Sequence, residues 1–233
     1  RDLFARFALT ERVVDLQNSD VGGFVPAGTY DLVIAEGFLY TLPDRDQLLG
    51  RIVTLIAPGG YGVISFNDRF GILIEMVRRY LYGRVCATQG IEVGADAGLA
   101  VAQALYFDDY ARLAASRPFA AWWKDVLANP FLANEHLWSY LELFALLEGM
   151  DCEIHGTSPR WSQVDSFSWY KTVLAPRDRQ ARLRAEWKRH LGFFLLGTPV
   201  EEGYGAPCSD EVVAAASDFV AEPLVVRILM ESV

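Results

Sequence analysis

Residues 30–66 constrain the fold most, because they alternate a strand pattern, a helix pattern and a second strand pattern. The strand patterns are the apolar runs YDLVIA at 30–35 and YGVISF at 61–66. Between them, the apolar residues of 44–56 recur at the spacing of one helical face. Two apolar strands joined by a single helix of this length are typical of parallel βαβ units. We therefore predict an α/β fold.

Short polar signals predict where the helices begin and end. Asp44 is a suitable N-cap for the helix of this unit, and Gln47 completes a capping box. The Pro-Gly-Gly at 58–60 is expected to stop the same helix. Ser139 and Glu142 form a second capping box, which predicts the start of a later helix.

After Asp68 the strand and helix alternation gives way to helical patterns over 69–133. Many aromatic side chains fall in this stretch: Tyr80, Tyr82, Tyr106, Phe107, Tyr110, Phe119, Trp122, Trp123 and Phe131. They suit the core of a small helical subdomain, and they also suit a lid over an apolar pocket. Because the stretch directly follows a strand, we favour a helical lid insert.

Further elements are expected on either side of this region. Residues 12–17 predict an earlier strand, and 152–156 and 167–174 predict two later ones. Residues 175–233 predict a helical C-terminal extension. Its arginine-rich run at 177–189 indicates a solvated helix face rather than an anion site.

Composition argues against several classes of protein. With 52% hydrophobic and 22% charged residues, the 233-residue chain is expected to be globular. Its net charge of −9 argues against binding nucleic acid, which needs clustered Lys and Arg. The three cysteines and three histidines lack disulfide or metal-ligand spacing, so we expect a cytoplasmic protein without a metal. No apolar run approaches the ~20 residues of a membrane span, so no membrane association is expected.

The segment YDLVIAEGFLYTLPDRDQLLGRIVTLIAPGGYGVISF, residues 30–66, resembles the second half of a class I S-adenosylmethionine-dependent methyltransferase. The matching features are the Tyr-Asp-Leu-Val strand start, the Leu-Pro at 42–43, the capped helix, the Pro-Gly-Gly and the strand after it. The resemblance covers about residues 1–68 and 134–174. It implies a partial Rossmann-like sheet of parallel strands with a final antiparallel strand at 167–174.

Two motifs of the resembled family are missing from this chain. They are the glycine-rich turn after the first strand of the family and the acidic residue after its second strand. The chain begins without Met, and Leu3, Phe4 and Phe7 already follow a helical spacing. We therefore expect a fragment that lacks part of the cofactor pocket.

The resemblance implies S-adenosyl-L-methionine as the cofactor, bound beyond the carboxyl ends of the strands. Glu36 and Gly37 follow the strand at 30–35. Gly37 would let the backbone approach the amino-acid end of the cofactor, and Glu36 would face its sulfonium, the substrate or solvent. The structural alternative for Glu36 is a helix cap or an arginine partner.

Four more residues are candidates for binding the cofactor. Ser19 and Asp20 correspond to the position near the adenine amino group, and the alternative for them is an ordinary Asx turn. Phe38 and Tyr40 would line the adenine and the methionine. An aromatic after a buried strand is more often part of the core, and of the two we favour Tyr40 for the pocket, since its hydroxyl needs a partner if buried.

Candidates for the substrate and the chemistry lie at the next strand end and beyond the insert. Asn67, Asp68 and Trp138 are expected to contact the substrate, although capping of the following helix is the better-supported role for Asp68. His136 is the candidate general base. These residues complete the predicted site.

The resemblance predicts methyl transfer to the oxygen or nitrogen of a small molecule. This reaction is an in-line displacement that depends mainly on alignment and desolvation, so a strong catalytic motif is not required. The alternative is a non-catalytic, methyltransferase-like binding or assembly module. A dinucleotide or nucleotide-sugar enzyme fits the Pro-Gly-Gly poorly. The acceptor and the oligomeric state are not indicated.

Overall fold

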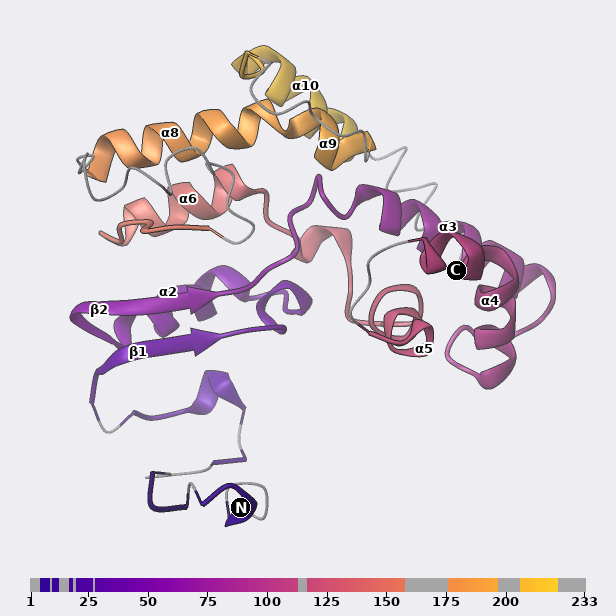
Figure 1. The fold of residues 1–233 in the computed structure, drawn as a ribbon, viewed down its shortest axis with the longest axis horizontal. Coiled ribbons are helices and arrows are strands. Elements are labelled where there is room, and N and C mark those ends of the chain that lie inside the picture. The colour runs from indigo at the N-terminus through magenta and orange to yellow at the C-terminus, as the bar shows by residue number, and fades with distance from the viewer. Residues whose placement is uncertain are drawn as a thin grey trace.

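The protein, seen in a computed structural model, is mixed α/β and mostly helical, with a small two-stranded parallel sheet (Figure 1). The structure describes residues 5–8, 10–12, 17–18, 20–26, 28–112, 117–157, 176–196 and 206–221. At this level the predicted α/β class is confirmed. Among the described helices, none has both the length and the apolar character that a membrane span requires.

Strands β1 (Tyr30–Ala35) and β2 (Ile56–Ile64) pair in parallel, as predicted for the βαβ unit. The register runs unbroken from Leu32 beside Tyr61 to the ends of both strands. Because the strands run in the same direction, their carboxyl ends meet at one edge of the sheet.

Strand β2 begins earlier than predicted, and the Pro-Gly-Gly at 58–60 lies inside it instead of ending the helix. Helix α2 (Arg45–Thr54) already ends before the proline. The register shifts between Tyr30 and Leu32, so the pairing is irregular here. An irregular position tolerates proline, which has no N–H to offer the ladder. Gly59 adopts a φ of +79°, which glycine accommodates readily.

The two predicted capping boxes have different outcomes. At α6 (Tyr140–Gly149), Glu142 N–H donates to the Ser139 hydroxyl at 3.2 Å and Ser139 N–H donates to the Glu142 carboxylate at 2.6 Å. This box is confirmed. At α2, Asp44 occupies the N-cap position but makes no side-chain cap bond, so that box is wrong. The ψ of Asp44 is 22°, whereas N-cap side chains reach the helix from extended backbone such as that of Ser139, with ψ 159°.

Helices α2 and α6 cover one face of the sheet. On that face Ala35 packs in a core with Leu49 of α2 and Leu143 of α6. Side chains that alternate with the covered ones point to the opposite side and are exposed: Tyr30, Leu32, Ile34, Tyr61 and Val63. We call these five residues the exposed sheet face.

The insert, residues 69–133, has a core of its own. Its described helices are α3 (Leu73–Thr88), α4 (Asp96–Ala111), α5 (Phe119–Trp122) and the π-helical segment η4 (Trp123–Leu127). Tyr82 is fully buried in this core and accepts a hydrogen bond from Trp123 Nε1 at 3.0 Å. Figure 1 shows the insert on the side toward which β1 and β2 run. A lid over the strand ends would occupy that side, and the lid role itself stays a prediction.

The chain leaves the sheet for the insert and returns to it at one point. Asp68 and Trp138 form an isolated parallel bridge, and Arg69 N–H donates to Trp138 O at 2.8 Å. The Arg69 side chain also donates to Leu137 O at 2.7 Å and pairs with Glu142 at 3.1 Å. These contacts hold both ends of the insert beside the start of α6.

In the C-terminal extension the structure describes α8 (Pro176–Arg189), α9 (Leu191–Leu196) and α10 (Asp210–Ala221). They share a separate core with the insert and α6, in which Trp187 packs edge-on against Phe70. Basic residues of α8 form these ion pairs: Arg179 with Glu153, Arg184 with Glu148, Lys188 with Asp210 and Arg189 with Glu186. These pairs favour the charged helix face over the anion site.

The outer strands of the predicted sheet are not found among the described residues. Residues 152–157 are described and form no strand, so the strand predicted at 152–156 is wrong. No described strand pairs with this segment to supply ladder hydrogen bonds. Its predicted neighbour at 167–174 lies outside the described residues. At 12–17, Arg12 belongs to the 3-10 turn η1 (Thr10–Arg12), and 13–16 lie outside the described residues.

Candidate functional site

The carboxyl ends of β1 and β2 form an edge that we call the strand-end rim, residues 36–38 and 65–68. Ligands of open parallel sheets bind beyond such ends. Ser65 forms two hydrogen bonds between the two strand ends. Its N–H donates to Ala35 O at 3.0 Å, and its hydroxyl accepts from Gly37 N–H at 2.7 Å. Gly37 has a φ of +82°, and a side chain at this position would meet no atom within 4 Å. The rim backbone at Gly37 therefore faces open space.

Glu36 follows β1 directly, and its side chain is exposed. It forms no hydrogen bond or ion pair with any other described residue. Neither a helix cap nor an arginine partner is therefore found for it in the described part of the chain. A carboxylate with free oxygens can accept hydrogen bonds from a ligand. The role of Glu36 in binding the cofactor stays a prediction.

The aromatics after Gly37 turn in different directions. Phe38 is half-buried and packs into the core beneath the sheet, as the core alternative expects. Tyr40, in the 3-10 turn η3 (Leu39–Thr41), packs against the core of the insert instead. Burial raises the pKa of Tyr40, Asp125 raises it further, and Arg117 lowers it. Tyr40 therefore lies where the strand ends meet the insert, and its contact with the cofactor stays a prediction.

Asp68 is half-buried, and both of its carboxylate oxygens are occupied. Oδ1 accepts from Phe70 N–H and Gly71 N–H, both at 2.9 Å, and Oδ2 accepts from Tyr140 N–H at 2.9 Å. Burial raises the pKa of Asp68, while these backbone hydrogen bonds lower it. Asp68 thus stabilises both the turn before α3 and the start of α6. This geometry supports capping, and the substrate contact stays a prediction.

Trp138 and Asn67 differ in what they offer a ligand. Trp138 is buried, its Nε1 donates to Asp46 at 2.7 Å, and the Arg45 guanidinium lies 5.0 Å from its ring centroid. The indole Nε1 is the only polar atom of this side chain, and it is already hydrogen-bonded. The ring packs between α2 and α6. Asn67 is half-buried and makes no hydrogen bond with other described residues, so its amide remains available on the rim. The predicted substrate contacts of both residues stay predictions.

His136 lies in the 3-10 turn η5 (Asn134–His136) and is half-buried. Its Nδ1 is 3.4 Å from Phe131 O, a long contact that fixes its ring only weakly. No carboxylate among the described residues bonds to this imidazole. A general base is usually oriented by such a partner. The catalytic role of His136 stays a prediction.

Asp20 forms the Asx turn that was its structural alternative. Its Oδ1 accepts from Gly22 N–H at 2.6 Å at the start of the 3-10 turn η2 (Val21–Gly23). Arg51 of α2 donates to the carbonyls of Gly22 and Phe24, which anchors this loop to the helix. Ser19 lies outside the described residues. Contacts of Ser19 and Asp20 with adenine stay predictions.

The sequence gives weak signals for two residues that the structure brings to this region. Ser65 is a lone polar residue at the end of an apolar strand, and that position was its only signal. Asp125 lies within the aromatic insert, pairs with Arg117 at 2.5 Å and influences Tyr40. Ser65 acts on Gly37, and Asp125 acts on Tyr40, across long stretches of sequence. No local sequence motif indicates such contacts.

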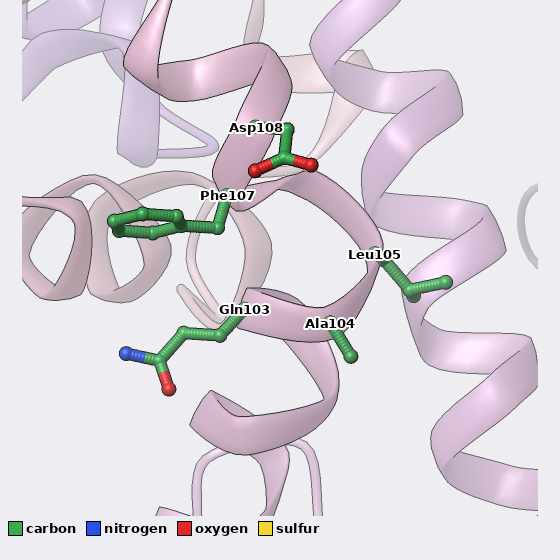
Figure 2. A pocket seen from close by; sticks show the side chains of 5 residues that line it. All are labelled: Gln103, Ala104, Leu105, Phe107 and Asp108. Carbon is green, nitrogen blue, oxygen red and sulfur yellow. The ribbon is translucent and has the colours of Figure 1, made fainter.

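Two other kinds of site have little support. A hollow of about 410 Å³ lies on α4, and its lining residues, Gln103, Ala104, Leu105, Phe107 and Asp108, all come from that one helix. Figure 2 shows Leu105 and Phe107 pointing in opposite directions, so the lining side chains do not converge on a ligand. Within the described residues, no group of three or more His, Cys, Asp or Glu side chains could hold a metal ion.

Comparison with known proteins adds no family to these observations. No protein-family model matches the chain, and searches of curated proteins and of solved structures found no match either.

Proposed function

We propose that the protein is an S-adenosyl-L-methionine-dependent methyltransferase that acts on the oxygen or nitrogen of a small molecule. The observation that carries this proposal is the Glu36 carboxylate, which has no partner among the described residues and lies beside the open backbone of Gly37, at the carboxyl ends of two parallel strands. The carboxylate fits the ammonium group of the cofactor, and the open space at Gly37 leaves room for the amino-acid end. The segment resemblance and the insert beyond the strand ends support the same proposal (Figure 1).

The proposed organisation follows the resemblance. Residues 1–68 and 134–174 form a partial Rossmann-like methyltransferase core with a final antiparallel strand, 69–133 form a lid, and 175–233 form a helical extension. A cytoplasmic location is part of the proposal, and its support is that Cys86, Cys152 and Cys208 are all free thiols.

Several residues of this chain have roles in the proposed reaction. S-Adenosyl-L-methionine, when bound, supplies an electrophilic methyl group. Glu36 accepts hydrogen bonds from the ammonium group of the cofactor, and its charge also favours the cationic sulfonium. Tyr40 and the insert exclude water from the strand-end rim. Asn67 orients the acceptor, and His136 takes up a proton where the acceptor must lose one.

A second candidate function is a non-catalytic binding or assembly module. The exposed sheet face favours it, because Leu32, Ile34 and Tyr61 are each more than half exposed, at 55%, 59% and 58%. Parallel sheets are normally covered on both faces. A partner that covers these residues would explain the face without any methyl transfer.

Calorimetric titration with S-adenosylhomocysteine tests the proposal on the protein made from its full reading frame. We expect binding by the unchanged protein and about tenfold weaker binding by Glu36→Gln, because a charge-assisted hydrogen bond is lost. The matched control is Glu92→Gln, which changes an exposed carboxylate of the insert and should leave the affinity unchanged.

Thermal melts of the same proteins separate binding from folding. Glu36→Gln should melt close to the unchanged protein, because Glu36 has no partner among the described residues. No binding by the unchanged protein would favour the binding module. A large loss of melting temperature with unchanged affinity would assign Glu36 to structure.

A further inference from the structure

Arg79 of α3 differs from the other half-buried arginines and lysines that the structure describes. Each of the others pairs with a carboxylate, as Arg78 does with Glu75 at 2.7 Å and Arg69 with Glu142 at 3.1 Å. Arg79 forms no ion pair with any described residue, although Glu75 lies one helical turn before it. The chain has 30 acidic and 21 basic residues, so a shortage of carboxylates does not explain this difference.

One hydrogen bond fixes the position of the Arg79 guanidinium. Its Nη1 donates to Val126 O at 2.8 Å. Val126 belongs to the π-helical segment η4, in which Ala128 N–H donates to Trp123 O at 2.9 Å. Because the last carbonyls of a helix lack donors from the helix itself, Arg79 stabilises the end of η4. This contact occupies Nη1 and leaves Nε and Nη2 for another acceptor.

The two remaining nitrogens of Arg79 are accessible to a ligand. Neither Nε nor Nη2 has a hydrogen-bond partner among the described residues. Neither is among the fully buried polar atoms that lack a partner, so both reach the surface. Burial lowers the pKa of Arg79, and no nearby carboxylate counters this effect. A half-buried charge without a partner is unfavourable, and an anion bound from solution would stabilise it.

We propose that Arg79 binds the carboxylate of a small organic anion, with Nε–H and Nη2–H each donating to one carboxylate oxygen. These two N–H groups point in the same direction, and their spacing matches that of the two oxygens. One guanidinium balances the single charge of a carboxylate, whereas phosphate is typically bound by a cluster of arginines. Arg78 does not supply a second free charge, because it is paired with Glu75. This site lies in the insert and does not depend on methyl transfer.

The test is a titration of the protein from its full reading frame with sodium benzoate at constant ionic strength. Backbone and arginine Nε–H signals in NMR spectra follow binding. Benzamide is the neutral probe, because it has the same ring without the charge. Arg79→Gln removes the charge, and Arg79→Lys keeps the charge but loses the paired donors. The matched control is Arg84→Gln, which changes an exposed arginine of the same helix.

We expect benzoate to shift the Nε–H signal of Arg79 with half-saturation in the millimolar range, as suits a single pair of charged hydrogen bonds open to water. The half-saturation concentration should rise roughly tenfold or more in Arg79→Gln, because both hydrogen bonds and the charge are lost. Arg79→Lys should bind more weakly than the unchanged protein and more tightly than Arg79→Gln. Arg84→Gln should bind like the unchanged protein, and benzamide should not shift the Arg79 signal.

Three results would overturn the proposal. They are an equal shift with benzamide, an unchanged half-saturation concentration in Arg79→Gln, and tighter binding of inorganic phosphate than of benzoate. Thermal melts show whether each variant is folded. If Arg79→Gln does not fold, the comparison of benzoate with benzamide on the unchanged protein and on Arg79→Lys decides the question. Because S-adenosylhomocysteine is not used, failure of the proposed function and failure of this inference are separate outcomes.

Discussion

The insert and the sheet bury their apolar side chains in very different ways. The buried residues of the insert core lie within 72–137. Inside this core, Trp123 donates a hydrogen bond to the hydroxyl of Tyr82. The sheet buries one face against α2 and α6 and leaves its other apolar face exposed. Helices of the insert find their partners nearby in sequence, whereas a parallel pair of strands depends on layers supplied from elsewhere. The insert therefore buries its apolar side chains largely among its own helices, whereas the sheet leaves one apolar face exposed.

The largest expected effect is in the insert core. Trp123 is 4% exposed, so Trp123→Ala should lower the free energy of unfolding by about 3–5 kcal/mol through the cavity that it creates. The variant also removes the donor to Tyr82. Urea unfolding followed by circular dichroism measures the loss.

The matched control is another aromatic of the insert. Phe131 is 67% exposed, so Phe131→Ala should change the free energy of unfolding by less than ~0.5 kcal/mol. Equal losses in the two variants would show that the insert has no specific core around Trp123.

A smaller effect is expected at Asp68, which links the sheet to the insert and α6. Asp68→Asn keeps one oxygen that can accept hydrogen bonds from the backbone. Its amide N–H₂ replaces the other oxygen and faces a backbone N–H donor, so that hydrogen bond is lost. We expect a loss of about 1–3 kcal/mol in the free energy of unfolding near neutral pH. Chemical denaturation of both proteins measures it.

The same pair of proteins tests the pKa of Asp68. Burial raises this pKa above the ordinary 3.8, so the folded state binds the proton more tightly than the unfolded state. The contribution of Asp68 to stability therefore falls as pH rises from 3.8 through the folded pKa. On acidification through that window, the unchanged protein should gain stability relative to Asp68→Asn. A relative loss on acidification would mean that the pKa is lowered instead.

The smallest expected change in the free energy of unfolding is on the exposed sheet face. Ile34 lies on the exposed sheet face, so Ile34→Ala should cost less than ~0.5 kcal/mol in the free energy of unfolding. Ile52 of α2 is 4% exposed in the core of the covered face, and Ile52→Ala should cost about 2–5 kcal/mol. Equal costs would show that the exposed sheet face is covered in the folded protein.

Features encoded within a few residues were predictable from the sequence. The strand at 30–35, its parallel partner and the box of Ser139 and Glu142 all follow local patterns that the structure confirms. The Pro-Gly-Gly was misleading because the same residues suit a helix stop and an irregular strand start. Local chemistry alone does not decide between these two structures.

Features that depend on distant partners were not predictable. The bond from Gly37 to Ser65 and the one from Tyr140 to Asp68 each join segments that share no motif. Asp44 matched the pattern of an N-cap, yet its backbone does not adopt the required conformation. For the candidate site, the sequence located the rim through Glu36 and Gly37 but gave only a weak signal for Ser65.

The bridge between Asp68 and Trp138 has a consequence for how freely the insert can change in length. The bridge holds the two ends of the insert together, so the insert is a closed loop whose body also packs against Tyr40 and the C-terminal helices. Closing a longer loop costs little more, because each doubling of length adds only about 0.6 kcal/mol of chain entropy. Loops within the insert can therefore lengthen or shorten while the strands keep their register.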